Sequence, residues 1–107
     1  SGKTMEIALK FIDENFRNEI TLDTIAEACF TNKYYLSHLF TRAQGVSVGK
    51  YILDKRITEA KRQLKDKDLT VAQISADVGF NDPSYFCRVF KKETGLTPLV
   101  YRKRSVI

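Results

Sequence analysis

The sequence predicts an all-α protein built from two copies of one helical unit. No stretch alternates apolar and polar residues with the period of two that marks a strand, and hairpin dipeptides such as Asn-Gly are missing. The first copy returns 49 residues later, with Leu22, Ile25 and Cys29 matched by Val71, Ile74 and Val78. After a slip of one residue, the segment 35–51 returns as 85–101. Such a repeat indicates a duplicated supersecondary unit.

Four helices are expected in the first half of the chain, where apolar residues recur with helical spacing. The expected ranges are Thr4–Phe16, 22–29, Lys33–Gln44 and about 48–65. Three of them follow residues that favour helix N-caps, namely Thr21, Asn32 and Ser47. Gly45 is expected to end the third helix in the left-handed conformation. Its buried stripe should be Tyr35, Leu36, Leu39 and Phe40.

Three more helices are expected in the second half. A capping box, Thr70-Val71-Ala72-Gln73, opens a short helix that ends in a turn at Gly79. Asp82 and Pro83 suit the start of a helix that runs to about Thr94 and stops at Gly95. Its inner residues should be Tyr85, Phe86, Val89 and Phe90. Thr97 and Pro98 repeat this start for a last helix at about 98–104, which makes seven helices and no sheet.

The order of short helix, tight turn and longer helix occurs twice, which is the outline of a helix-turn-helix. A chain of 107 residues fits one small domain or two subdomains that share a central element. We expect a first subdomain at 1–47, a linker helix at 48–66 and a second subdomain at 67–107. At 1.5 Å per residue, the central helix would be a rod of about 27 Å.

The net charge of +5 is unevenly distributed. Residues 1–47 carry five Lys/Arg and six Asp/Glu, whereas residues 48–107 carry thirteen and seven. A basic surface suggests an anionic partner, although such an excess is often only a solvated face. No apolar run approaches the roughly 20 residues that span a bilayer, and the start lacks a signal peptide. We therefore expect a cytoplasmic protein with no membrane partner.

Catalytic, metal and cofactor sites are not expected. Cys29 and Cys87 form no Cys-x-x-Cys pair, and the single His38 does not complete a metal site with them. We expect both cysteines to be reduced thiols. No paired carboxylates, phosphate-binding glycine loop or nucleophile with a nearby base stands out, so the chain is predicted not to be an enzyme.

Burying the apolar stripe of each longer helix leaves an outer face for a partner. The outer residues of the first are Lys33, Tyr34, Ser37, His38, Thr41 and Arg42, and those of the second are Ser84, Cys87, Arg88, Lys91 and Lys92. In a helix-turn-helix, the second helix enters the major groove of DNA. Arg88 would then bind guanine through two hydrogen bonds. The N-terminus capped by Asn32 would favour phosphate. A helical protein-interaction module with a basic face is the alternative.

Three segments carry a family resemblance, namely Arg56-Ile57-Thr58-Glu59-Ala60-Lys61, Ile74–Phe80 and Asp82–Pro98. From about Met5 to Arg104, the chain resembles the DNA-binding domain of the AraC/XylS family. The resemblance implies a homeodomain-like tandem of two helix-turn-helix subdomains joined by a long helix, with recognition helices at 33–44 and 83–94. It also implies a transcription regulator, usually an activator, that inserts both helices into successive major grooves of promoter DNA, with RNA polymerase as a second partner.

Matched by position, the resemblance assigns DNA contacts to Tyr34, Ser37, His38 and Arg42 in the first recognition helix and to Ser84, Cys87, Arg88 and Lys91 in the second. Two residues depart from the family pattern. His38 stands where arginine is common, and Phe30 aligns with the turn glycine Gly79. The family domain commonly follows a ligand-binding or phosphoacceptor domain, so this chain is either a fragment of a longer regulator or a short stand-alone regulator, and we favour the fragment.

Overall fold

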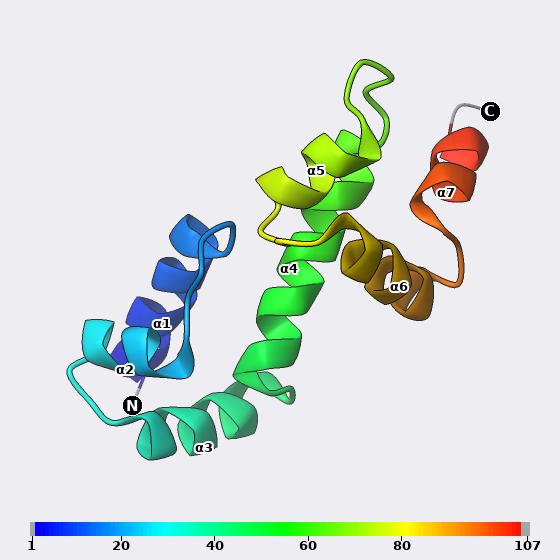
Figure 1. Ribbon diagram of the computed structural model, residues 1–107. Coiled ribbons are helices and arrows are strands. Elements are labelled where there is room, and N and C mark those ends of the chain that lie inside the picture. The colour runs from blue at the N-terminus through cyan, green and yellow to red at the C-terminus, as the bar shows by residue number, and fades with distance from the viewer. Residues whose placement is uncertain (1, 106–107) are drawn as a thin grey trace. The chain divides into compact units, whose positions relative to one another are not determined.

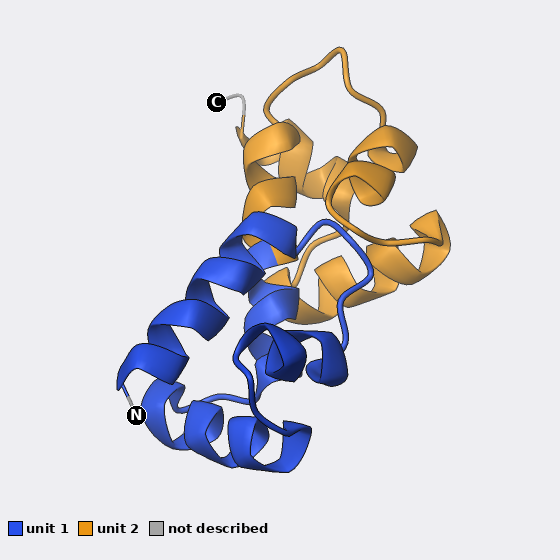
Figure 2. Ribbon diagram, turned by 90° about the vertical axis from the view of Figure 1, so that its left-hand side faces the viewer, with its two compact units in different colours: residues 1–55 blue, residues 56–107 orange. Residues whose placement is uncertain are grey.

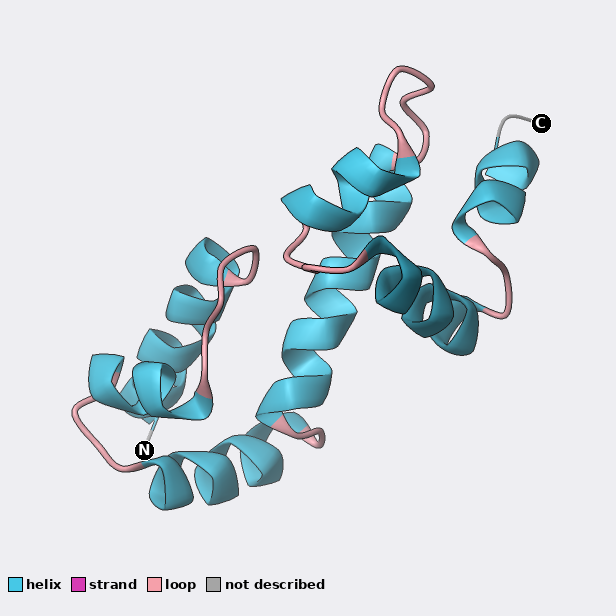
Figure 3. Ribbon diagram, viewed as in Figure 1, coloured by secondary structure: helices cyan, strands magenta, loops and turns pink. Residues whose placement is uncertain are grey.

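The computed structural model describes residues 2–105, and these residues form seven helices without a strand (Figures 1 and 3). The helices are α1 (Gly2–Asn15), α2 (Leu22–Ala28), α3 (Lys33–Gln44), α4 (Val48–Gln63), α5 (Val71–Asp77), α6 (Pro83–Thr94) and α7 (Pro98–Ser105). The predicted all-α fold class is confirmed. The predicted limits of α1 and α4 were wrong by up to two residues, because α1 starts at Gly2 and α4 ends at Gln63. None of the described helices has the length and apolar character that a membrane crossing requires.

The predicted helix caps are present. Asn32 Oδ1 accepts a hydrogen bond from the backbone N–H of Tyr35 at 2.9 Å, which satisfies one of the free donors at the start of α3. In the Thr70 capping box, Thr70 Oγ1 accepts from Gln73 N at 3.0 Å, and Gln73 Oε1 accepts from Thr70 N at 2.9 Å. Gly45 and Gly95 end the two longer helices of the repeat, α3 and α6, with φ of 77° and 84°. These local signals explain why the two helices begin and end where the sequence predicts.

The chain divides into two compact units (Figure 2). Unit 1 is Ser1–Lys55 and unit 2 is Arg56–Ile107, so that the division falls within α4. Unit 1 contains the α1–α2–α3 helix-turn-helix and the first half of α4. Unit 2 contains the second half of α4, the α5–α6 helix-turn-helix and α7. Each unit therefore holds one copy of the sequence repeat.

Unit 1 is held together by an apolar core at the meeting point of its helices. Its fully buried side chains come from α1, α2 and α3: Ala8, Ile12, Ile25, Leu36 and Phe40. The ring of Phe40 meets Tyr51 of α4 edge to face, with the centroids 5.3 Å apart. Outside this core, Lys55 Nζ lies 2.6 Å from Asp13 Oδ1, and this hydrogen bond raises the pKa of the lysine above its usual value.

Unit 2 has an aromatic core of its own. Phe86 and Phe90 of α6 are fully buried, with ring centroids 5.7 Å apart, and Phe90 meets Tyr101 of α7 edge to face at 5.4 Å. Ile74, Val78 and Leu64 of the same unit also have no solvent exposure. The helix α6 is packed against α5 and α7.

A single arginine ties α7 to the end of α4. Arg102 donates from Nε to the carbonyl oxygen of Leu64 at 2.8 Å and from Nη2 to those of Asp66 at 3.2 Å and Leu69 at 2.6 Å. The last carbonyl groups of a helix lack partners within it, and a guanidinium suits them in both charge and geometry. This contact spans 38 residues of sequence, and it lies at the point where α4 ends earlier than predicted.

The two helix-turn-helix turns share one hydrogen-bond pattern but differ in sequence. Thr31 N donates to Ala26 O at 3.0 Å in the first turn, and Phe80 N donates to Ser75 O at 2.9 Å in the second. Each turn needs a residue with positive φ just before this donor. Gly79 supplies it at 108° in the second turn, whereas Phe30 adopts 55° in the first. A non-glycine residue pays about 1–2 kcal/mol for this conformation, and the ring of Phe30 is 93% exposed.

We expect Phe30→Gly to raise the free energy of unfolding by about 0.5–1 kcal/mol, measured by urea unfolding. Glycine removes the steric strain of the folded state, which raises the free energy of unfolding. Its greater conformational freedom in the unfolded chain offsets part of this increase. The exposed ring has little packing to lose. As the matched control, Gly79→Ala should lower the free energy of unfolding by more than about 1 kcal/mol, because it places a side chain on a backbone with φ of 108°. A loss of stability in Phe30→Gly would contradict the argument.

Candidate nucleic-acid interface

The two recognition helices present side chains in the same pattern. Leu36 and Phe40 of α3 are fully buried, as are Phe86 and Phe90 at the corresponding positions of α6. Around these anchors, the exposed members of the two outer faces occupy matched positions: Tyr34 and Ser84, His38 and Arg88, Thr41 and Lys91, Arg42 and Lys92. Ser37 and Cys87 also match and are half-buried at the edge of each face. Each outer face is therefore a single surface of one helix.

The outer face of α3 begins with an aromatic ring beside a cation. Tyr34 is 77% exposed, and Lys33 Nζ lies 5.5 Å from the centroid of its ring. The same ammonium group lies 3.8 Å from Asp23 Oδ2 of α2, in a solvent-exposed ion pair that contributes little to stability. Further along the face, His38, Thr41 and Arg42 are exposed. This face offers one ring, hydroxyl and imidazole groups, and a cation at each end.

The outer face of α6 is more strongly cationic. Arg88, Lys91 and Lys92 are exposed along it. The Arg88 guanidinium lies 5.8 Å from the ring centroid of Tyr85, one turn earlier on the helix. At the N-terminus, Asp82 Oδ1 accepts from Ser84 N at 3.0 Å, so a carboxylate caps this helix where an amide caps α3. The two faces thus share a geometry but differ in chemistry.

Two predictions about buried side chains were wrong. Tyr35 and Tyr85 were expected in the inner stripes, but they are 48% and 51% exposed. The four predicted inner residues of α3 span about 140° of the helix circumference at 100° per residue, and Tyr35 stands at one end of this arc. A tyrosine at the edge of such a stripe turns its hydroxyl group toward water. From this edge position in the sequence pattern, both tyrosine rings could have been predicted to lie beside the outer faces.

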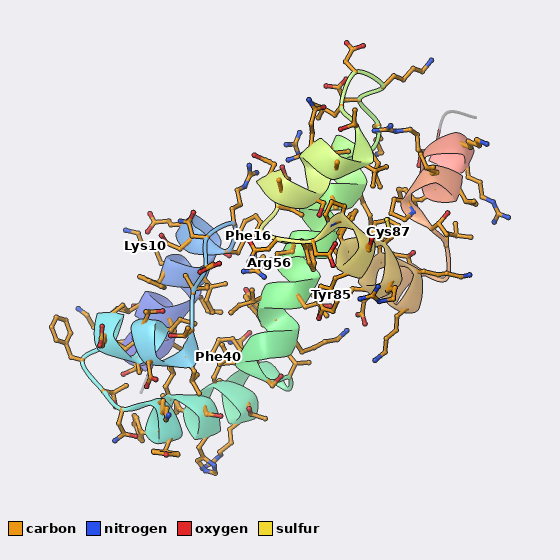
Figure 4. All side chains as sticks on the ribbon, viewed as in Figure 1. Lys10, Phe16, Phe40, Arg56, Tyr85 and Cys87 are labelled. Atoms are coloured by element: carbon orange, nitrogen blue, oxygen red, sulfur yellow. The ribbon has the colours of Figure 1, made fainter. Side chains whose placement is uncertain are left out.

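A metal site and a reactive cysteine find no support among residues 2–105. No group of three or more His, Cys, Asp and Glu side chains lies close enough to hold a metal ion in this part of the chain. Both cysteines are free, and burial raises the pKa of the Cys29 thiol, which makes it less reactive. Cys87 is half-buried on α6 (Figure 4). The outer faces of α3 and α6 remain as the candidate site.

Comparison with known proteins identifies the family to which this fold belongs. A family model described as a helix-turn-helix domain matches residues 25–104. The chain belongs to the AraC-type helix-turn-helix family. The resemblance inferred from its residues is thereby confirmed, and with it the general class of function, DNA binding in transcription regulation.

This AraC-type domain is similar to YijO of Escherichia coli K12, an uncharacterized transcriptional regulator, with 36% identity over 104 residues that cover 97% of this chain and 37% of YijO. It is also similar to the C-terminal domain of the response regulator yesN from Fusobacterium nucleatum, with 33% identity, a TM-score of 0.89, and coverage of 94% of this chain and 98% of that domain.

The DNA-binding domain of AdpA, solved in complex with a target DNA, shares the fold with a TM-score of 0.85 at 19% identity, over 94% of this chain and 90% of that one. The AraC-type domain spans only part of its longer relatives, with 37%, 33% and 48% of the length of three curated ones.

Proposed function

We propose that this chain recognises specific sites in double-stranded promoter DNA by inserting α3 and α6 into successive major grooves. The observation that carries the proposal is the matched outer faces of the two helices, which present polar and cationic groups over the same pattern of buried anchors. The second helix of a helix-turn-helix is the element that enters the major groove. The proposed working division is 1–47, 48–66 and 67–107.

The proposed contacts follow from the chemistry of each side chain. Arg88 has the fork of donors that binds guanine O6 and N7. Lys33, Arg42, Lys91 and Lys92 would contact phosphates. Shorter polar contacts would come from Ser37, His38, Thr41, Ser84 and Cys87, and Tyr34 would pack on a thymine methyl group or a phosphate. Asn32 would leave the amide end of α3 open to a phosphate, since its side chain carries no charge.

Half-sites that face the same side of B-DNA lie about 34 Å apart, or about 10 base pairs. To test the proposal, bound sites would be selected from random duplex DNA with this chain. We expect one composite site with two conserved half-sites about one helical turn apart. Equal binding to all sequences would overturn the proposal in favour of a basic protein-interaction module.

We expect affinity for the selected site to fall steeply with salt. Neutralising phosphates with Lys33, Arg42, Lys91 and Lys92 releases counterions, so the logarithm of the binding constant should fall against the logarithm of salt concentration with a slope of about −3 to −4. Fluorescence anisotropy with labelled duplex between low and moderate salt measures this slope. A slope near zero would show that these side chains do not contact the DNA backbone.

We further propose that the chain acts within a longer regulator, because it spans only part of the relatives that it matches. An effector or receiver domain would then control it, and transcription activation through RNA polymerase would be its output. Its role would be binding without catalysis, and its target DNA would place it in the cytoplasm.

A further inference from the structure

Behind the outer face of α6, four side chains pack one against the next, with an arginine over a ring at each end and two rings tilted by 54° in the middle. Arg56 of α4 lies over the ring of Phe80, with its Cζ 5.8 Å from the centroid. The Phe80 ring lies 6.1 Å from the ring of Tyr85, and the Arg88 guanidinium lies 5.8 Å from Tyr85 on the outer face. Figure 4 labels Arg56 and Tyr85 within this series. A side chain of α4 is thereby linked to the group proposed to read guanine.

The inner end of the series is firmly held. Phe80 is only 5% exposed and also packs on Phe86, with the centroids 5.1 Å apart. Arg56 is half-buried, and its loss of hydration lowers the pKa of the guanidinium from its usual value. Tyr85 thus packs at a tilt against a ring that is held in the core of unit 2. Its other neighbour, Arg88, is exposed.

The ring of Tyr85, which packs against the buried Phe80, restricts the exposed arginine beside it. A free side chain of this length loses about 1.5–2 kcal/mol of conformational entropy when it is ordered. Guanidinium groups stack well on aromatic rings, and an arginine that is ordered before binding loses less entropy when it forms two bonds to a base. The contact between Tyr85 and Arg88 therefore favours the two-bond contact with guanine, which requires one arginine conformation. It gives less advantage to a phosphate contact, which many arginine conformations can make.

Unit 1 lacks these partners. The residue that corresponds to Phe80 in the turn is Thr31, since both donate the same turn hydrogen bond. The position of Arg88 is held by His38. Tyr35 matches Tyr85, but unit 1 has neither the middle ring nor the guanidinium at the matched positions. The series is thus a feature of the second recognition helix.

We infer that Tyr85 is a positioning residue that holds Arg88 for guanine, so that one guanine in the half-site bound by α6 is the most sharply discriminated base of the whole site. The inference rests on the proposed function, in which α6 reads DNA. Because Tyr85 is half-exposed, its replacement leaves the core of unit 2 in place.

The test compares Tyr85→Leu, Tyr85→Phe and the unit 1 control Tyr35→Leu on two duplexes, the selected site and the same site with its key guanine pair replaced. The ratio of the two dissociation constants measures discrimination. Tyr85→Leu should reduce this ratio about two- to fivefold, the value expected for one exposed cation–π contact. Tyr85→Phe keeps the ring and should keep the ratio, and Tyr35→Leu should leave it unchanged.

A second readout needs no DNA. In the free protein, the NMR order parameter of Arg88 Nε should fall in Tyr85→Leu and stay at the wild-type value in Tyr85→Phe. An unchanged order parameter or an unchanged ratio in Tyr85→Leu would overturn the inference while the proposed function stands. An equal loss of discrimination in Tyr85→Phe would also overturn the inference, since the hydroxyl group and not the ring would then position Arg88. Wild-type protein without sequence preference would instead end the proposed function itself.

Discussion

Phe90→Ala is expected to lower the free energy of unfolding of unit 2 by about 3–5 kcal/mol. Phe90 has no solvent exposure and contacts the rings of Phe86 and Tyr101, so its removal leaves a cavity between α6 and α7. Urea unfolding followed by far-UV circular dichroism measures the loss. Amide hydrogen exchange should locate the faster opening in unit 2, with the protection of α1 and α2 little changed.

The matched control is Leu99→Ala, which also removes a large apolar side chain from the same region. Leu99 is 58% exposed, and we expect its loss to change the free energy of unfolding by less than about 0.5 kcal/mol. Equal effects of the two substitutions would mean that the aromatic cluster does not stabilise unit 2. Phe40, labelled in Figure 4, is the counterpart in unit 1 and is fully buried there. Phe40→Ala should therefore cause a similarly large loss in the free energy of unfolding, and hydrogen exchange should locate that loss in unit 1.

Arg88→Ala should weaken binding to the selected site by about 1–3 kcal/mol, which is the usual value for an arginine that binds guanine through two bonds. Binding to unrelated duplexes should fall much less, because an arginine that reads a base contributes to specificity. Competition binding with the selected site and with unrelated DNA measures both. Since Arg88 is exposed, the folded structure should be unaffected, as a thermal melt would show.

Lys92→Ala serves as the comparison on the same helix. Because Lys92 is proposed to contact a phosphate, its loss should weaken binding to all sequences alike and reduce the salt slope by about one. If Arg88→Ala behaved in the same way, Arg88 would be a phosphate contact and would not read a base. The pair of variants therefore separates the two kinds of contact on one helix.

The sequence predicted best those features that depend on residues close together in the chain, namely helix caps and helix ends. Asn32 and Thr70 accept hydrogen bonds from the third residue of their helices, as their types and positions predict. Gly45 and Gly95 have positive φ at the predicted helix ends. Each of these features involves residues within four positions of one another, so that spacing and residue type are sufficient to predict it.

Features that depend on distant residues were not predicted. The end of α4 at Gln63 lies beside the carbonyl groups that Arg102 binds from α7, and no local pattern indicates this contact. The series from Arg56 to Arg88 joins residues 32 positions apart through Phe80 and Tyr85, and it became visible only with the packing of α4 on the turn. The outer residues were predicted from helix geometry, whereas the surroundings that orient them were not.

The separate cores of the two units bear on how this domain can be altered. Each unit buries its own anchors, Leu36 and Phe40 of α3 in unit 1 and Phe86 and Phe90 of α6 in unit 2. An exposed residue on either outer face can therefore be exchanged without opening the core of the other unit. The two faces can then be altered one at a time, and a folded protein is kept at every step.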